Sequence, residues 1–137
     1  MQCNRMCAEF NIIADINRGA LRVTMGGFFS HADVTAFLAE VHAKLGQLRM
    51  APNTHLMLCD VRTMKIQSQD IVAAFGQIVG DPRSRSKRLA FVTGSSLSRL
   101  QAKRLSNRDG IAYFADLSEA EDWLFDEAFH TLAAAAE

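Results

Sequence analysis

The chain has 137 residues, few cysteines and prolines, and no long apolar run. Its three cysteines, Cys3, Cys7 and Cys59, lack the paired spacing of a disulfide scaffold or a zinc ribbon. Cys3 and Cys7 would supply only half of a metal shell, because no histidine or second cysteine pair lies near them in the sequence. We therefore expect plain thiols in a reduced, intracellular protein that has neither a metal nor another cofactor.

The sequence has no stretch suited to crossing a membrane or directing secretion. No segment approaches the ~20 apolar residues of a membrane span, and the first residues lack the apolar core of a signal peptide. The prolines, Pro52 and Pro82, fall between periodic segments and do not mark a linker. We expect one cytoplasmic domain over residues 1–137, with residues 1–8 forming a flexible N-terminus.

The formal charge is zero, with 15 basic and 15 acidic residues, which excludes a general attraction to nucleic acid or anionic membranes. The two signs are nevertheless segregated along the chain. Residues 83–108 contain basic residues and no acidic ones, whereas residues 109–137 contain acidic residues and no basic ones. Nucleic-acid binding through the basic stretch is the weakest hypothesis, because this stretch lacks interleaved aromatic residues.

Hydrophobic periodicity and capping residues predict alternating strands and helices. Strands are expected at 9–15, 20–25, 56–61, 89–93 and 111–114. Helices are expected after the N-cap Ser30, from Ser68 to Gly80, from Ser95 to about Asn107, and from a capping box at Ser118–Glu121 to the mid-130s. This order predicts an α/β fold with a five-stranded, mixed but mainly parallel sheet and four helices, connected as ββαβαβαβα.

Two features of this order resemble a known superfamily. Asp60 ends the central strand, and the chain closes with the pattern Phe114, Ala120 and Trp123-Leu124. Over roughly residues 8 to 125 the sequence resembles the STAS superfamily of sulphate transporters and anti-sigma-factor antagonists, in its bacterial, sporulation stage II AA-like branch. The resemblance implies a STAS-like fold and a non-enzymatic regulatory or protein-interaction module.

The sequence departs from this superfamily at the phosphorylation segment. The antagonists carry a phosphorylatable serine in an Asp-Ser-Ser/Thr-Gly segment after the central strand. Here the matching segment is Asp60-Val61-Arg62-Thr63-Met64, in which the aspartate matches but the serine and the glycine do not. Val61 cannot accept a phosphate and Thr63 lies two residues too late, so we predict a module without the usual phosphorylatable serine.

Ligands of open parallel sheets gather outside the carboxyl ends of the strands. The loops expected there predict a ligand rim. Its residues are Phe28, Phe29, His31, Asp60, Arg62, Thr63, Ser95 and Ser96. Ser95 and Ser96 open a helix that could bind an anion, although serines at helix starts are usually caps. Of the adjacent Phe28 and Phe29, at least one is expected to enter the core, and the alternative is a pocket lid or a partner contact.

Catalysis is not favoured by this set, and we assign no catalytic residue. His31 with Asp60 is the one pairing that suggests acid–base chemistry, with Ser95 or Ser96 as a nucleophile. The sequence contains no G-x-S-x-G nucleophile elbow. A small enzyme using His31 and Asp60 therefore remains a minor alternative.

The last two helices predict a partner surface. In the third, Leu97 and Leu100 begin an apolar stripe that continues inward as Gln101 and then arginines. In the fourth, aromatic residues extend the apolar stripe beyond what one sheet face needs. We expect a homodimer or protein partner to contact Arg104, Arg108, Phe125, Phe129 and Leu132.

The alternative function is the binding of a small apolar or anionic ligand. The sporulation-type branch is also similar to the CRAL-TRIO lipid-binding fold, which implies an apolar pocket. Phe28, Phe29 and Met64 are the loop residues that could line it.

Overall fold

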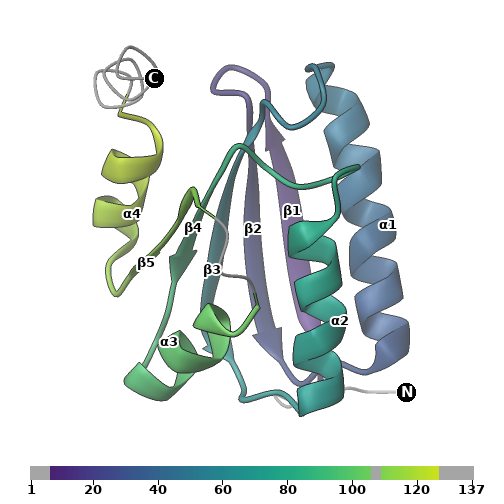
Figure 1. Ribbon diagram of the computed structural model, residues 1–137, viewed down its shortest axis with the longest axis vertical. Helices are drawn as coiled ribbons and strands as arrows, with labels where there is room; N and C mark the ends of the chain where they lie inside the picture. Colours follow the sequence, from purple (N-terminus) through teal and green to yellow (C-terminus); the bar gives the residue numbers. More distant parts are fainter. Residues whose placement is uncertain (1–6, 106–108, 127–137) are drawn as a thin grey trace.

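The fold was determined as a computed structural model that describes residues 7–105 and 109–126 (Figure 1). It confirms the predicted class and order of elements. The strands are β1 (Glu9–Asp15), β2 (Ala20–Gly27), β3 (Leu56–Met64), β4 (Arg88–Val92) and β5 (Ile111–Phe114). The helices are α1 (His31–Leu48), α2 (Gln69–Gly80), α3 (Ser96–Lys103) and α4 (Leu117–Leu124).

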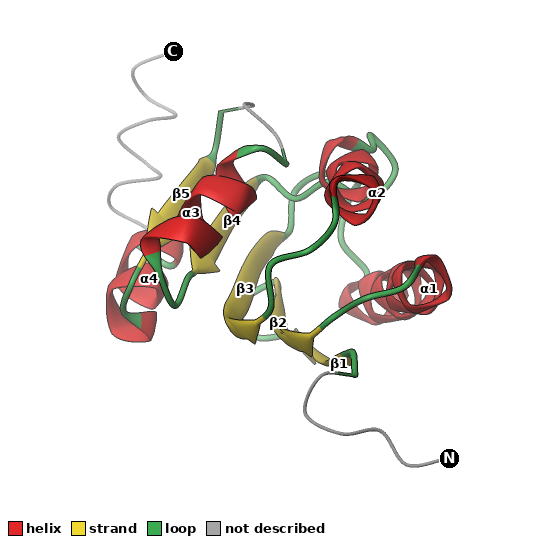
Figure 2. Ribbon diagram, turned by 90° about the horizontal axis from the view of Figure 1, so that it is seen from below, coloured by secondary structure: helices red, strands yellow, loops and turns green. Residues whose placement is uncertain are grey.

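The strands lie in the sheet in their chain order, with β1 antiparallel to β2 and all later neighbours parallel. Each parallel strand is thus added on the same side of the previous one. Right-handed crossovers then place every connecting helix on one face. The core agrees, because residues of α1, α2 and α3 share one cluster, whereas α4 packs on the opposite face (Figure 2).

Alternation along the central strand supplies both cores. From β3, Met57, Cys59 and Val61 face the three-helix side, and Leu58 faces α4. On the three-helix side, four phenylalanines from β1, the β2–α1 segment, α1 and α2 pack ring against ring: Phe10, Phe29, Phe37 and Phe75. This aromatic cluster fixes the position of α1 and α2 over the sheet.

The N-cap predicted at Ser30 is present, and the expected helix starts Ser68 and Ser95 are the N-caps of α2 and α3. Ser30 and Asp33 form a capping box, and Ser68 and Ser95 accept backbone N–H groups of α2 and α3. The cap predicted for the last helix is wrong. Asp116, not Ser118, caps α4 by accepting the backbone N–H of Ser118. The Asp116 carboxylate, two residues earlier, serves equally well as the cap acceptor, so α4 does not begin with the capping box expected at Ser118–Glu121.

Two helices end earlier than expected. α3 ends at Lys103, where Arg104 and Leu105 form a turn that donates back to carbonyls of the last helical turn. α4 ends at Leu124, with Phe125 as its C-cap. The rest of the two expected helices, residues 106–107 and 127 onwards, lies outside the described residues.

A β-bulge reshapes the carboxyl end of the sheet. The register between β2 and β3 shifts between Thr24 and Gly26, so that Thr63 pairs with Gly26. Gly27 follows with φ +79°, and a side chain there would clash with the carbonyl of Cys7. Cys7 forms an isolated bridge with Phe28, and Ala8 packs on the core, so the segment before β1 is fixed against this corner. Within the described residues, no helix is long and apolar enough to span a membrane.

Candidate functional site

The orientation of α3 corrects the sequence-based expectation. Leu97 and Leu100 were expected to begin its inner stripe, but their exposed fractions are 59% and 54%. The buried residue of the helix is Ala102, and Leu105 packs against the same cluster. Gln101 turns inward in place of the leucines, because its side-chain amide forms hydrogen bonds with the backbone N–H and carbonyl of Gln67.

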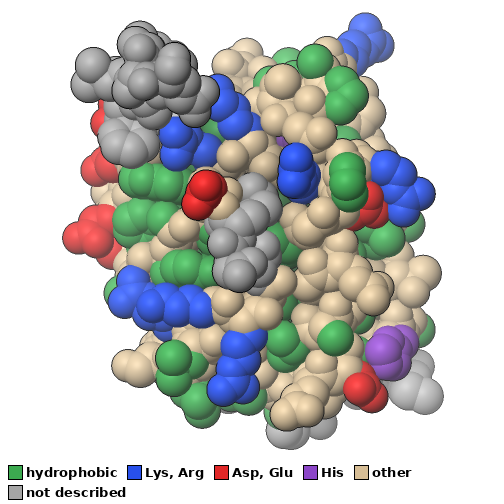
Figure 3. All heavy atoms as spheres, viewed as in Figure 1, with side chains coloured by type: hydrophobic (Ala, Val, Ile, Leu, Met, Phe, Trp, Pro, Cys, Tyr) green, Lys and Arg blue, Asp and Glu red, His purple; other side chains and the backbone are tan. Residues whose placement is uncertain are grey.

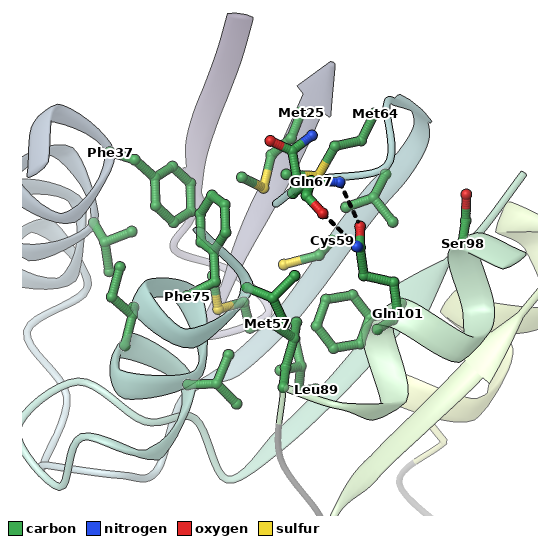
Figure 4. Close-up of a pocket in the computed structure, with 18 of the residues that line it drawn as sticks. Met25, Phe37, Met57, Cys59, Met64, Gln67, Phe75, Leu89, Ser98 and Gln101 are labelled. Carbon is green, nitrogen blue, oxygen red and sulfur yellow. Dashed lines mark hydrogen bonds between the residues drawn. The ribbon is translucent and has the colours of Figure 1, made fainter. Parts of the chain in front are cut away.

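Gln67 is the polar centre of the carboxyl end of the sheet (Figure 4). Its side chain is buried, accepts the N–H of Phe29 at 2.8 Å, and donates to the carbonyls of Gly27 and Lys65. Its backbone N–H and carbonyl each bond to the Gln101 amide at 2.9 Å. Gln67 thus ties together the segment after β2, the segment after β3, and α3.

Each residue of this network has an exposed apolar neighbour in the chain. Phe28 precedes Phe29, Ile66 precedes Gln67, and Leu100 precedes Gln101. With Leu97 one turn earlier on α3, these four residues form what we call the edge patch. Their exposed fractions run from 41% for Ile66 and 42% for Phe28 up to those of the two leucines. Over α3, hydrophobic side chains lie among lysine and arginine side chains (Figure 3).

Of the predicted rim, Asp60 and Arg62 are brought together. Arg62 donates to both carboxylate oxygens of Asp60, at 2.9 and 2.7 Å. The hydrogen bonds from Arg62 lower the pKa of the Asp60 carboxyl. His31 begins α1, which packs on the other face of the sheet from the one that Asp60 shares with Val92. Among the described residues, Asp60 bonds to Arg62 and no hydrogen bond or ion pair joins it to His31.

The hydroxyl groups of the rim are used structurally. Ser95 is the cap of α3, where it also donates to the Ser98 hydroxyl at 3.1 Å. Ser96 is exposed in the first turn. Thr63 donates to the carbonyl of Met25 at 3.3 Å, on the α4 side of the bulge. None of these hydroxyls contacts a histidine among the hydrogen bonds of the described residues.

The two adjacent phenylalanines differ in burial. Phe29 is 6% exposed and joins the aromatic cluster, as expected for one of the pair, while Phe28 faces outward in the edge patch.

Beneath this edge lies an apolar cavity of about 80 Å³ between the sheet and the helices α1, α2 and α3. Methionine sulfur atoms and aromatic rings form much of its wall, as Figure 4 shows for Met25, Met57 and Phe75. Apolar cavities of this kind stay dry. An empty cavity of about 80 Å³ forfeits roughly 2 kcal/mol of packing free energy, at ~24 cal/mol per Å³.

Cys59 lies in the wall of this cavity. Burial, with a smaller contribution from the charge of Asp60, raises the pKa of its thiol to about 12. The thiol is therefore protonated at neutral pH and acts as a small apolar group. The described residues contain no group of three or more His, Cys, Asp or Glu side chains that could hold a metal ion.

The structure describes two of the five residues that were predicted to form the partner surface. Phe125 packs beside the α4 core and lies under two guanidinium groups, with the Cζ of Arg18 at 4.6 Å and that of Arg22 at 5.4 Å from its ring centre. Arg104 is exposed at the end of α3. Arg108, Phe129 and Leu132 lie outside the described residues.

Sequence reasoning missed Gln67 and the cavity. A single glutamine between Ile66 and the Ser68 cap carries no signal of burial, because glutamine is usually exposed. The cavity is lined by the same residue types as a filled core, so periodicity does not distinguish the two.

Known proteins share this architecture. No protein-family model and no curated protein matches the chain. Among solved structures, it is similar to an uncharacterized DUF3478-family protein with a SpoIIAA-like fold from Shewanella loihica, with 17% identity, a TM-score of 0.65, and coverage of 90% of this chain and 98% of that one. It is also similar to an anti-sigma factor antagonist from Mycobacterium paratuberculosis, with 12% identity, a TM-score of 0.52, and coverage of 85% and 94%. The chain therefore has a SpoIIAA-like fold, which confirms the STAS-like architecture expected from the sequence.

Proposed function

We propose that this protein is a non-enzymatic interaction module whose edge patch binds an acidic, amphipathic segment of a partner protein. The observation that carries the proposal is the outward display of Leu97 and Leu100 on α3. A helix that buries a glutamine and exposes its leucines has an apolar face available for another chain. Hydrogen bonds join Gln67, the neighbour of Ile66, to Phe29 and Gln101, which are the chain neighbours of Phe28 and Leu100.

Charge complementarity defines the partner. Arg99, Lys103 and Arg104 lie on or beside α3, and none of them is in an ion pair among the described residues. The acidic α4 packs on the opposite face, where Glu121 pairs with Arg22 at 3.0 Å. The basic surface of α3 is therefore not neutralised by α4, and an acidic partner segment would complement it.

The module is proposed to act without a phospho-switch after the central strand. Val61 stands where the antagonists have their serine, and it is buried in the cavity wall. The hydroxyl of Thr63 is turned to the carbonyl of Met25. The structural likeness to an anti-sigma factor antagonist supports a role in regulation through protein binding.

The test compares two double variants as baits in the native cells. Leu97→Ser with Leu100→Ser removes the exposed leucines of α3. Ile13→Ser with Ile16→Ser is the matched control, since these residues are 51% and 66% exposed on and beside β1. Circular dichroism first establishes that both variants fold.

We expect a discrete protein to bind the wild type and the control and to be lost by about tenfold or more with the α3 variant. The purified pair should dissociate at higher salt, and the contacting segment of the partner should be acidic. Equal capture by both variants, or loss with the Ile13/Ile16 variant alone, would overturn the proposal.

A second candidate function is the binding of a small apolar ligand. The specific observation in its favour is the apolar cavity, whose lining extends to Met64 and Lys65, next in the chain to Ile66 of the edge patch. The two functions are compatible, because the cavity and the patch share the Gln67–Gln101 connection.

A further inference from the structure

The leucines of the edge patch share one face of α3 with a positive charge. Leu97, Leu100 and Arg104 follow each other at spacings of three and four residues, which is the spacing of a single helix face. Both leucines are more than half exposed, and Arg104 is exposed at the C-cap. Among the ion pairs of the described residues, none involves Arg104. An occupant of this face therefore needs an apolar side bordered by negative charge.

The chain itself contains a stretch with this composition, residues 127–137, which we call the acidic segment. It lies outside the described residues, and its pattern comes from the sequence. Phe129, Leu132 and Ala136 follow each other at spacings of three and four residues, as on α3. The segment contains Glu127 and Glu137 and no lysine or arginine. Its pattern is therefore acidic and amphipathic, which complements the face of Leu97, Leu100 and Arg104.

The edge patch of the same chain is too distant from the start of this segment. The Phe125 ring lies against Arg18 and Arg22, at the β1–β2 turn, and Figure 1 shows α3 at the opposite end of the sheet. From this turn β2 extends about 25 Å at ~3.3 Å per residue before Phe28 begins, and α3 and α4 pack on opposite faces. Phe129 follows Phe125 by four residues, which span at most about 14 Å. An occupant supplied by this sequence therefore comes from a second copy.

We propose that the acidic segment of one copy binds the edge patch of a second copy. Phe129 and Leu132 then pack against the leucines of α3, and the glutamates lie beside its basic residues. This inference rests on the proposed function and adds a regulation of it, because one patch cannot hold the segment and the partner protein at once. Reciprocal contacts close a two-fold dimer, whereas one-way contacts continue from copy to copy.

The experiment is sedimentation velocity of the purified full chain over a wide range of concentrations. The segment variant carries Phe129→Ser with Leu132→Ser. Its matched control carries His130→Ser with Ala134→Ser, two positions that the helical spacing places on the other side of the segment. We expect the wild type and this control to self-associate equally, and high salt to weaken the association of both.

The sharpest measurement mixes two defective chains. The segment variant retains an intact edge patch, and the variant with Leu97→Ser and Leu100→Ser retains an intact acidic segment. We expect each of them alone to self-associate about tenfold or more weakly than the wild type. Their mixture should associate again, because an intact patch on one chain meets an intact segment on the other.

A labelled peptide of residues 127–137 makes the test independent of whether the segment variant folds. It should bind the wild-type chain and the variant with Ile13→Ser and Ile16→Ser, and bind about tenfold or more weakly to the variant with Leu97→Ser and Leu100→Ser. Equal binding to all three chains would contradict the proposed contact.

The outcomes separate this inference from the proposed function. A wild type that remains monomeric at every concentration, or a mixture of the two defective chains that does not associate, would overturn the self-association. Capture of a partner protein by the baits described above is measured separately, so the edge patch can still be the partner site in that case. Where the inference holds, the segment variant captures more of that partner than the wild type does, because its own segment no longer competes.

Discussion

At the scale of single residues, Cys59 connects burial to a measurable chemical property. Its thiol has a pKa of about 12 in the folded chain, against 9.0 for an ordinary cysteine, chiefly because burial disfavours the thiolate. A raised pKa in the folded state means that the contribution to stability is complete below pH 9. It is lost as the pH rises from 9 toward 12, because the unfolded chain ionises first.

We predict that wild type and Cys59→Ala converge in stability above pH 9. The free energy of unfolding of the wild type should fall by about 1.4 kcal/mol per pH unit relative to the variant. Urea titrations at several pH values between 8 and 11 measure this difference, and Cys3 and Cys7 cancel because both proteins carry them. A constant difference across this range would mean that Cys59 is not buried as described.

The sequence predicted the residues that begin the first three helices better than it predicted contacts between distant residues. Ser30, Ser68 and Ser95 were identified because a cap depends on local sequence, and each is in place. Pairing between distant residues was not predictable in the same way. His31 begins α1 after β2, but Asp60 lies within β3, where strand alternation turns it toward the α4 side of the sheet, and its carboxylate pairs with Arg62.

At the scale of elements, the orientation of α3 depends on backbone groups of one residue outside it, Gln67. Helical periodicity shows which residues of α3 share a face, but not which face turns inward. Leu97 and Leu100 would be the inner residues of an ordinary core helix. The Gln67 backbone instead bonds to the Gln101 amide, which rotates the leucines outward and puts Ala102 against the core.

We predict that Gln67→Met destabilises the chain by about 2–4 kcal/mol. Methionine has a similar length, but it removes the amide that bonds to the Phe29 N–H and the Lys65 carbonyl, and the Gly27 carbonyl keeps only the Lys65 N–H. Gln69→Met is the matched control, because Gln69 is exposed at the start of α2 and should change stability by less than about 0.5 kcal/mol. Equal urea midpoints for the two variants would show that the Gln67 network contributes little.

At the scale of the whole molecule, the order of strands accounts for the two layers. Sequential parallel strands with crossovers of one hand put three helices on one face, and α4, which is followed by no further strand in the described chain, covers the other. This much was predictable from the alternation of strands and helices. The cavity was not, because its volume depends on how α1, α2 and α3 sit over the sheet.

The basic and acidic residues that cancel in the net charge lie on different helices of the fold. Acidic α4 meets Arg22 of β2 through Glu121, and its Trp123 ring lies 5.6 Å from the guanidinium of Arg88. Basic α3 lies on the other face and directs Arg99 and Lys103 toward Tyr113 of the edge strand β5. The basic residues of α3 are thus not paired with the acidic residues of α4, which favours an acidic partner on the α3 side.

The central claim, that the edge patch is the binding surface, is tested most directly by site-specific photocrosslinking in the native cells. A benzophenone amino acid replaces Leu97 in one variant and Ile16 in the other, since both positions are exposed but lie in different parts of the fold. We expect a discrete protein adduct from position 97 and none from position 16. The same adducts from both positions, or an adduct from position 16 alone, would contradict it.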